Sequence, residues 1–200
     1  MRRFLREHSL TLVFAGLFLA ALVGQFFAGH ADYNERQAAL GQPVLSLGAY
    51  LTSADFVVDV FENWQSEYLQ FFLYVTATVW LVERGSPESK RVKDAGLKPE
   101  RRHRWLYENS LGLAMLSLFL FSWTMQWIAG WYANNSDPLA EKTSLVGYFF
   151  SADFWNRSLQ NWQSEFLAIA SMAILSVYLR QRGSPESKPV EAEPVSDGSK

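Results

Sequence analysis

Two long stretches without a charged residue constrain this chain more than any other feature. Residues 10–29 and 111–133 contain no Asp, Glu, Lys, Arg or His. At about 1.5 Å of rise per residue, a helix of this length crosses the ~30 Å hydrocarbon core of a bilayer. The average conceals this pattern, because the mean hydropathy of the whole chain is −0.05. The two stretches predict transmembrane helices and argue against an ordinary soluble domain.

A tandem duplication organises the rest of the sequence. At an offset of 98 residues, 22 of the 45 positions in 46–90 are identical to those in 144–188. The shared strings are polar as well as apolar, with NWQSE at 63–67 and 161–165 and RGSPESK at the end of each segment. Chance similarity between apolar stretches does not reproduce such strings, so the chain is predicted to consist of two tandem repeats.

Each repeat is predicted to form two membrane helices, which makes an all-α polytopic membrane protein with four transmembrane helices in two parallel repeats. Thr52 or Ser53 is expected to cap the second helix of the first repeat, and Gly85 and Gly183 are expected to end the second helices. The predicted boundaries, in chain order, are a first repeat over 1–90 with helices at about 10–29 and 63–82, a basic cytoplasmic linker over 91–105, a second repeat over 106–188 with helices at about 111–131 and 161–180, and a disordered tail over 189–200.

The basic residues predict the orientation. Of the 18 Lys and Arg, 15 lie in the N-terminus, between Arg84 and Arg104, or after Leu179. Cytoplasmic loops of membrane proteins carry the excess of Lys and Arg. The N- and C-termini and the central linker are therefore predicted to be cytoplasmic, with the protein in the cell (plasma) membrane. The segment Lys90–Arg104 is also a candidate to bind anionic lipid headgroups.

The first apolar stretch also resembles a secretory signal peptide, because Arg2, Arg3 and Arg6 precede it and small residues follow it. It is longer than the ~7–15 residues of a usual signal core, however, and it has a counterpart starting at Leu111 in mid-chain. We therefore expect Met1–Gly29 to be retained in the mature protein.

Several chemistries have no signature in the sequence. The formal net charge is −2, which gives no general attraction to nucleic acid. The chain has no Cys, and its three His lie far apart near the predicted membrane boundaries, so no metal site and no cofactor are expected. Neither a phosphate-binding glycine loop nor a nucleophile elbow occurs, and no enzymatic activity is predicted.

Two Gln and two Glu are predicted to lie at one depth in the membrane. Gln25 and Gln126 occupy matching positions of the first and third helices, and Glu67 and Glu165 those of the second and fourth. Counted from the cytoplasmic ends, all four lie about 21–22 Å into the ~30 Å core. They form a candidate polar layer. Hairpin neighbours at equal depth are the nearest partners, so we expect Gln25 beside Glu67 and Gln126 beside Glu165.

The sequence leaves three interpretations of this layer open. The NWQSE segments could lie at the outer membrane interface, with Trp64 and Trp162 as aromatic anchors and the carboxylates in headgroup water. A structural Gln–Glu hydrogen bond could join the helices of one repeat. Glu67 and Glu165 could instead bind protons or cations.

Small residues form a stripe through the first helix, with Gly16, Ala20, Gly24 and Ala28 at a spacing of four residues. Such a stripe lets another helix approach closely. Packing within the chain and the seam of a homo-oligomer both fit this stripe, which the third helix does not repeat.

The paired NWQSE and RGSPESK strings, on 200 residues with four predicted spans, resemble an uncharacterised family of small bacterial integral membrane proteins. The resemblance covers nearly the whole chain apart from the C-terminal tail. It implies a location in the bacterial plasma membrane but no activity, so no functional residue is carried over from it.

These observations predict a non-enzymatic structural or accessory membrane protein. The lipid bilayer is its expected partner, and a homo-oligomer is a further expectation. The alternative is a small channel or transporter component that uses the polar layer of Glu67 and Glu165 with Gln25 and Gln126.

Overall fold

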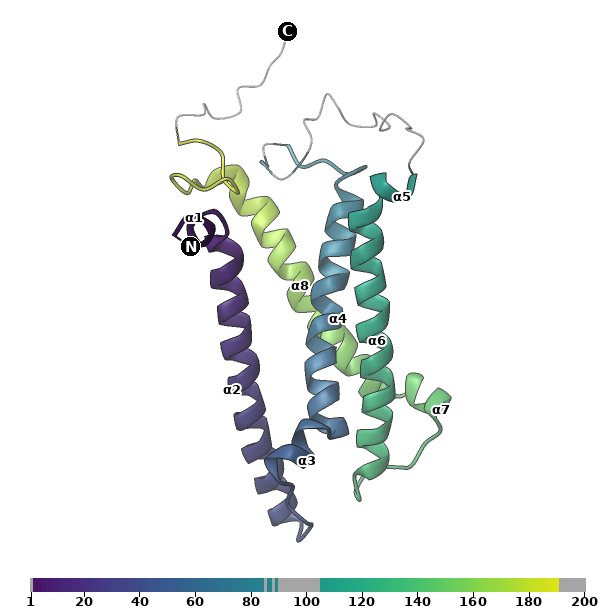
Figure 1. The fold of residues 1–200 in the computed structure, drawn as a ribbon. Coiled ribbons are helices and arrows are strands. Elements are labelled where there is room, and N and C mark those ends of the chain that lie inside the picture. Colours follow the sequence, from purple (N-terminus) through teal and green to yellow (C-terminus); the bar gives the residue numbers. More distant parts are fainter. Residues whose placement is uncertain (1, 85, 88, 90–104, 191–200) are drawn as a thin grey trace.

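Four long helices run alternately up and down in the computed structural model, which describes residues 2–84, 86–87, 89 and 105–190 (Figure 1). The long helices are α2 (Ser9–Ala39), α4 (Ala54–Ala77), α6 (Ser110–Ser136) and α8 (Ala152–Tyr178). The short ones are α1 (Arg2–Glu7), α3 (Leu47–Leu51), α5 (Trp105–Glu108) and α7 (Leu145–Phe149). No strand occurs among the described residues, so the all-α prediction is confirmed for them.

α4 is the central helix of the bundle. It runs alongside α6 and also contacts α8, which crosses it obliquely (Figure 1). α2 joins the group through aromatic side chains near α3. Phe26 of α2 packs against Tyr50 of α3 and Phe56 of α4, with ring centroids 5.9 and 5.4 Å apart. No residue of α2 is buried, so α2 is the peripheral helix of the four.

Serine side chains begin the helices on either side of each turn. Ser53 Oγ accepts a hydrogen bond from the N–H of Phe56 and so caps α4, as expected. Equivalent caps are Ser46 for α3, Ser144 for α7 and Ser151 for α8. The short helices α3 and α7 are not predicted above, because a helix of five residues is too short to show a periodic pattern.

The second long helix of each half ends earlier than its glycine suggests. α4 ends at Ala77 and α8 at Tyr178, so the prediction that glycines end these helices is wrong. At the end of α8 the guanidinium of Arg180 donates to the last carbonyls and satisfies them, so the helix can end there without a glycine. Gly183 has a φ of +81° and forms a turn further along the chain. Gly85 lies outside the described residues.

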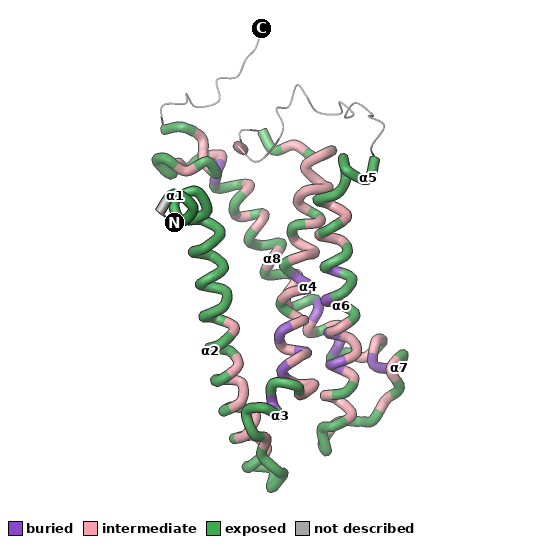
Figure 2. Tube along the Cα trace, in the orientation of Figure 1, coloured by how far each residue is buried: buried purple, intermediate pink, exposed green. Residues whose placement is uncertain are grey.

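Most buried side chains gather in the half of the bundle near α3 and α7 (Figure 2). An apolar cluster there contains Tyr50, Phe56 and Val60, with Phe26 and Trp64 packed against it. The opposite end of the bundle holds the start of α2 and α6 and the ends of α4 and α8 (Figure 1). The core therefore lies at the turn end of the two hairpins.

Two of the described helices, α2 and α6, are long and apolar enough to cross a membrane. Their most apolar windows have mean hydropathies of 2.2 and 1.5. α4 and α8 carry more polar residues and do not meet the same criterion. The four predicted spans, their parallel arrangement and the domain boundaries stay predictions at this point.

Candidate functional site

Polar side chains are buried where α4, α6 and α8 meet. Gln65 of α4 and Gln126 of α6 are both 0% exposed. Trp162 Nε1 of α8 donates to Gln65 Oε1 at 2.7 Å, and Gln126 Nε2 donates to Ser158 Oγ of α8 at 3.3 Å. A buried polar group without a partner costs about 1–3 kcal/mol. The two bonds satisfy these buried amides. They also connect α8 to α4 and to α6.

This interior keeps hydrogen-bonding capacity that the protein's own side chains leave unused. Ser122 Oγ and Gln126 Oε1 are buried and have no hydrogen-bond partner among the described residues. The two residues are four apart on α6, which places them on the same helix face, one turn from each other. The buried face of α6 is thus more polar than its contacts require.

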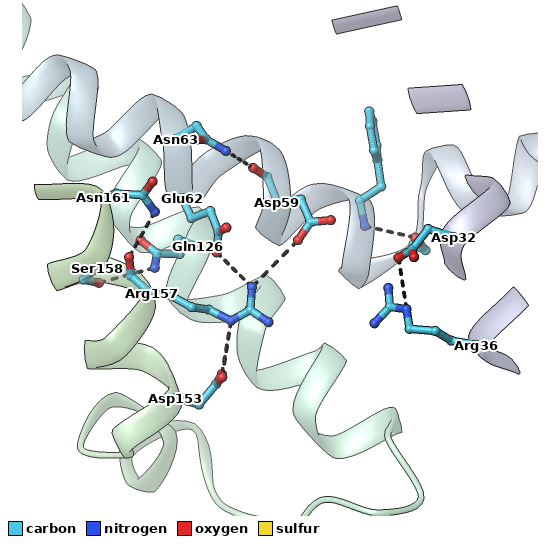
Figure 3. A network of polar contacts seen from close by, with 12 residues as sticks. Asp32, Arg36, Asp59, Glu62, Asn63, Gln126, Asp153, Arg157, Ser158 and Asn161 are labelled. Atoms are coloured by element: carbon cyan, nitrogen blue, oxygen red, sulfur yellow. Dashed lines mark hydrogen bonds and ion pairs between the residues drawn. The ribbon is translucent and has the colours of Figure 1, made fainter. Parts of the chain in front are cut away.

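Arg157 of α8 is the centre of an ion-pair network at the turn end of the bundle (Figure 3). Its Nη1 lies 2.9 Å from Glu62 Oε2 and 3.8 Å from Asp59 Oδ1, both on α4. Its Nε lies 3.3 Å from Asp153 Oδ1 on α8. Three carboxylates surround one guanidinium, so the network carries a net negative charge when all are ionised.

The network joins equivalent positions of the two halves. Asp59 and Arg157 correspond at the offset of 98 residues, so one position of the repeat carries opposite charges in its two copies. In the structure these two side chains face each other across the contact between α4 and α8. No prediction from the sequence includes this network, although the charge reversal at a matched position of the repeat is a signal for it.

A cavity of about 150 Å³ lies beside the network and is lined by charged and polar groups, among them Arg36, Asp55, Asp137, Tyr148 and Asp153. Tyr148 Oη donates to Asp153 Oδ2 at 2.7 Å. Burial and this bond raise the pKa of Tyr148. The described residues contain no group of three or more His, Asp or Glu placed to hold a metal ion.

A second cavity lies between α4 and α8, further toward the helix ends. This groove has a volume of about 310 Å³ and is mostly apolar. Its lining includes Gln70, Phe71, Tyr74, Ile169, Met172 and Glu186.

Residues 1–199 match the family described as a domain of unknown function, DUF6766. The chain belongs to the DUF6766 family. The expectation of an uncharacterised family is therefore confirmed. No curated protein and no solved structure matches the chain.

The four residues of the predicted polar layer do not form the expected pairs in this DUF6766 protein. Gln25 and Glu67 are exposed, and no hydrogen bond joins them among the described residues. Gln126 donates to Ser158 rather than to Glu165. Glu165 Oε1 instead accepts a long bond of 3.5 Å from Ser66 Oγ of α4.

The physical reason for this difference is the position of α4. α2 is peripheral, so the exposed side chain of Gln25 does not face a buried hydrogen-bonding group. The amide of Gln126 on α6 is already bound by Ser158, two helical turns before Glu165. α8 therefore presents its glutamate to α4, in the other half of the chain, rather than to its hairpin partner.

The two tryptophans of the NWQSE strings make contacts between helices. Trp162 packs against Trp123 of α6 with ring centroids 6.1 Å apart, and its N–H points to the buried Gln65. Trp64 packs against Phe18 of α2 at 5.9 Å. Trp162 thus supplies the donor that the buried Gln65 oxygen needs, and the role of both tryptophans as interface anchors stays a prediction.

The small-residue stripe of α2 faces away from the rest of the chain. Gly16, Ala20, Gly24 and Ala28 are all exposed, and nothing lies within 4 Å of a Cβ placed at either glycine. The expectation that the stripe packs against another described helix is therefore wrong. The expectation that it forms the seam of a homo-oligomer stays a prediction. The segment Lys90–Arg104, with its expected contacts to lipid headgroups, lies outside the described residues, as does most of the tail.

Proposed function

We propose that this DUF6766 protein is an integral membrane protein with four spans, formed by α2, α4, α6 and α8 as two parallel two-helix repeats. Its proposed role is structural or accessory and non-enzymatic. The proposed partner is the lipid bilayer of the cell (plasma) membrane, with both termini in the cytoplasm.

The distribution of polarity is the observation that carries this proposal. The residues at 0% exposure include Gln65, Gln126 and Ser158, whereas large apolar side chains such as Phe14 of α2 and Leu167 of α8 are exposed. A soluble monomer rarely exposes a continuous apolar surface of this kind. In a bilayer the same surface meets lipid, and Gln65, Gln126 and Ser158 form hydrogen bonds inside the bundle.

The lengths and charges of α4 and α8 support their inclusion as spans. With 24 and 27 residues, both helices are longer than the ~20 residues that cross a bilayer core. Polar residues lower the mean hydropathy of the two helices. Two of them, Gln65 and Ser158, face the interior of the bundle and not the lipid. Their ionised groups Asp59, Glu62 and Arg157 gather at the turn end, which is the end opposite the basic termini.

Labelling of single cysteines tests the number of spans directly, because the chain has no Cys of its own. The four variants are Leu40→Cys, Ala95→Cys, Leu139→Cys and Val190→Cys. Four spans with cytoplasmic termini predict that positions 40 and 139 label from outside, and positions 95 and 190 only after the membrane is opened.

The same variants distinguish four spans from two. If only α2 and α6 cross, position 95 lies outside with position 40, and position 139 lies inside. Labelling in that pattern would refute the proposal. The labelling at position 40 serves as the common reference, since both arrangements place it outside.

A small channel or transporter component is the second candidate. The observation in its favour is the half-buried Glu165, which accepts from Ser66 across the α4–α8 contact and lies on the groove side of α8. Proton or cation flux in proteoliposomes tests it. A flux that Glu165→Gln abolishes supports this candidate, and an absence of protein-dependent flux removes it.

A further inference from the structure

We infer that the groove between α4 and α8 binds a lipophilic organic cation, a molecule with one positive charge on a largely apolar body. This site rests on the proposed placement of α4 and α8 in the membrane, and it does not require that the ligand be transported.

The size and lining of the groove suit a compact organic molecule. Its volume of about 310 Å³ falls at the lower end of the ~300–1,000 Å³ of small-molecule pockets. Phe71 of α4 faces Ile169 and Met172 of α8 across it. Met is flexible and polarizable, so the groove can adapt to ligands of different shape.

Carboxylates lie toward both ends of this apolar groove. Glu186 lines it directly, beyond the end of α8. Glu67 precedes Gln70 by three residues and Phe71 by four, so it shares their helix face. Glu165 precedes Ala168 by three residues and Ile169 by four, so it shares their face of α8, one turn before the groove. Of the described residues that line the groove, none is Lys or Arg.

The glutamates next to the groove differ from the carboxylates of the Arg157 network. In that network Glu62 and Asp153 are already paired with a guanidinium. Among the described residues, neither Glu67 nor Glu165 forms an ion pair, and the polar contact of Glu165 is the hydroxyl of Ser66. A carboxylate in a membrane without a cationic partner attracts one. The charge of the groove therefore selects a cation over an anion of the same shape.

Aromatic and polar groups in the lining favour an organic cation over a bare metal ion. Phe71 and Tyr74 both lie on the groove face of α4. Ring faces attract cations whose charge is spread over an apolar body. A metal ion requires several oxygen ligands at short range, and the described residues supply no such group.

Two ions of equal shape and opposite charge test the inference. Full-length protein in nanodiscs of phosphatidylcholine is titrated with tetraphenylphosphonium and with tetraphenylborate, and binding to empty nanodiscs is subtracted. We expect protein-dependent binding of the phosphonium at least tenfold tighter than that of the borate. The double variant Glu67→Gln/Glu165→Gln should weaken phosphonium binding at least tenfold.

Matched variants separate charge from folding. Glu35→Gln changes an exposed glutamate near the end of α2 and should leave binding unchanged. Glu165→Asp keeps the charge and should keep the preference for the cation. Ala168→Trp places a large ring on the groove face and should remove binding of the phosphonium without lowering the melting temperature.

Equal binding of both ions would overturn the inference and indicate a groove filled by lipid acyl chains. Phosphonium binding that survives Glu67→Gln/Glu165→Gln at full strength would overturn it as well. The proposed function fails in a different experiment, because the number of spans is read from cysteine labelling and not from ligand binding.

Discussion

The turn between α2 and α4 and the turn between α6 and α8 are built from the same contacts. In the first, Asn34 Nδ2 donates to the carbonyl of Leu45 at 2.9 Å, and Asn34 Oδ1 accepts from its N–H at 2.8 Å. In the second, Asn135 forms the same two bonds with Thr143, each of 2.9 Å. Each asparagine thus holds the chain at the point where it turns back toward the next helix.

A buried tyrosine completes each turn. The hydroxyl end of Tyr50 lies against Gly29, and that of Tyr148 lies against Gly130, so close that neither glycine has room for a Cβ. Both tyrosines are almost fully buried, at 2% and 1% exposure. The glycine is therefore needed for the close approach of the ring in both halves.

The helices that precede these equivalent turns differ. α2 has no buried residue, whereas five residues of α6 are buried, among them Ser122 and Gln126. The turns depend on local residues that both halves keep. The helix surfaces depend on neighbours, and only α6 has α4 and α8 around it. A repeated sequence thus gives the same local geometry twice, while its packing is set by the position of each copy in the bundle.

The largest effect is expected from filling the space beside the tyrosines. Gly29→Ala and Gly130→Ala each force a methyl group against the end of a buried tyrosine ring, at a cost of about 1–3 kcal/mol in the free energy of unfolding. Titration with sodium dodecyl sulphate measures this. Gly48→Ala is the control, because nothing lies within 4 Å of its Cβ. If only one of the two turns is sensitive, the turns are not equivalent.

The next effect concerns the contact that holds the two halves together. Arg157→Ala removes the hydrogen bond to Glu62 and leaves three carboxylates facing one another. The arginine side chain is 36% exposed, so we expect a loss of about 1.5–2 kcal/mol, at the lower end for bonds to charged groups.

A charge exchange sharpens this test. Asp59→Arg should destabilise the protein by placing two guanidinium groups at matched positions, and Asp59→Arg/Arg157→Asp should recover part of the loss. No recovery in the double variant would show that the pair is not coupled. Both are measured by the same detergent titration.

The asparagine contacts should give smaller and matched effects. Asn34→Ala and Asn135→Ala each remove two hydrogen bonds to a backbone group at a partly exposed turn, for which we expect about 1–2 kcal/mol. The decisive quantity is the difference between the two variants. Equal losses support one turn used twice, and a loss confined to one asparagine contradicts it.

The sequence predicts those elements that depend only on the residues within them. Apolar stretches without charges locate α2 and α6, whose starts at Ser9 and Ser110 agree with the predicted 10 and 111 to one residue. The prediction ends α2 at 29, but the helix continues to Ala39, where Arg36 forms a 3.1 Å ion pair with Asp32 one turn away.

The candidate site is harder to predict because it joins residues far apart in sequence. Arg157 and Glu62 are 95 positions apart and belong to different repeats. Depth along a helix follows from counting residues, which is how the Gln25 and Glu67 layer is derived. Depth does not determine which face of a helix meets which neighbour. Counting residues therefore could not predict that Glu165 faces α4 instead of α6.

The smallest effect is expected at the charge that belongs to one half only, since the position matching Asp59 is Arg157. Asp59 Oδ1 lies 3.8 Å from Arg157 Nη1, and the side chain of Asp59 is 42% exposed. Exposed ion pairs of this kind contribute about 0–1 kcal/mol, so Asp59→Asn should lower the free energy of unfolding by less than about 1 kcal/mol. The same detergent titration measures this loss. Asp32→Asn, which changes an exposed carboxylate of α2 outside this network, is the control, and a loss for Asp59→Asn as large as that for Arg157→Ala would contradict the minor role of Asp59.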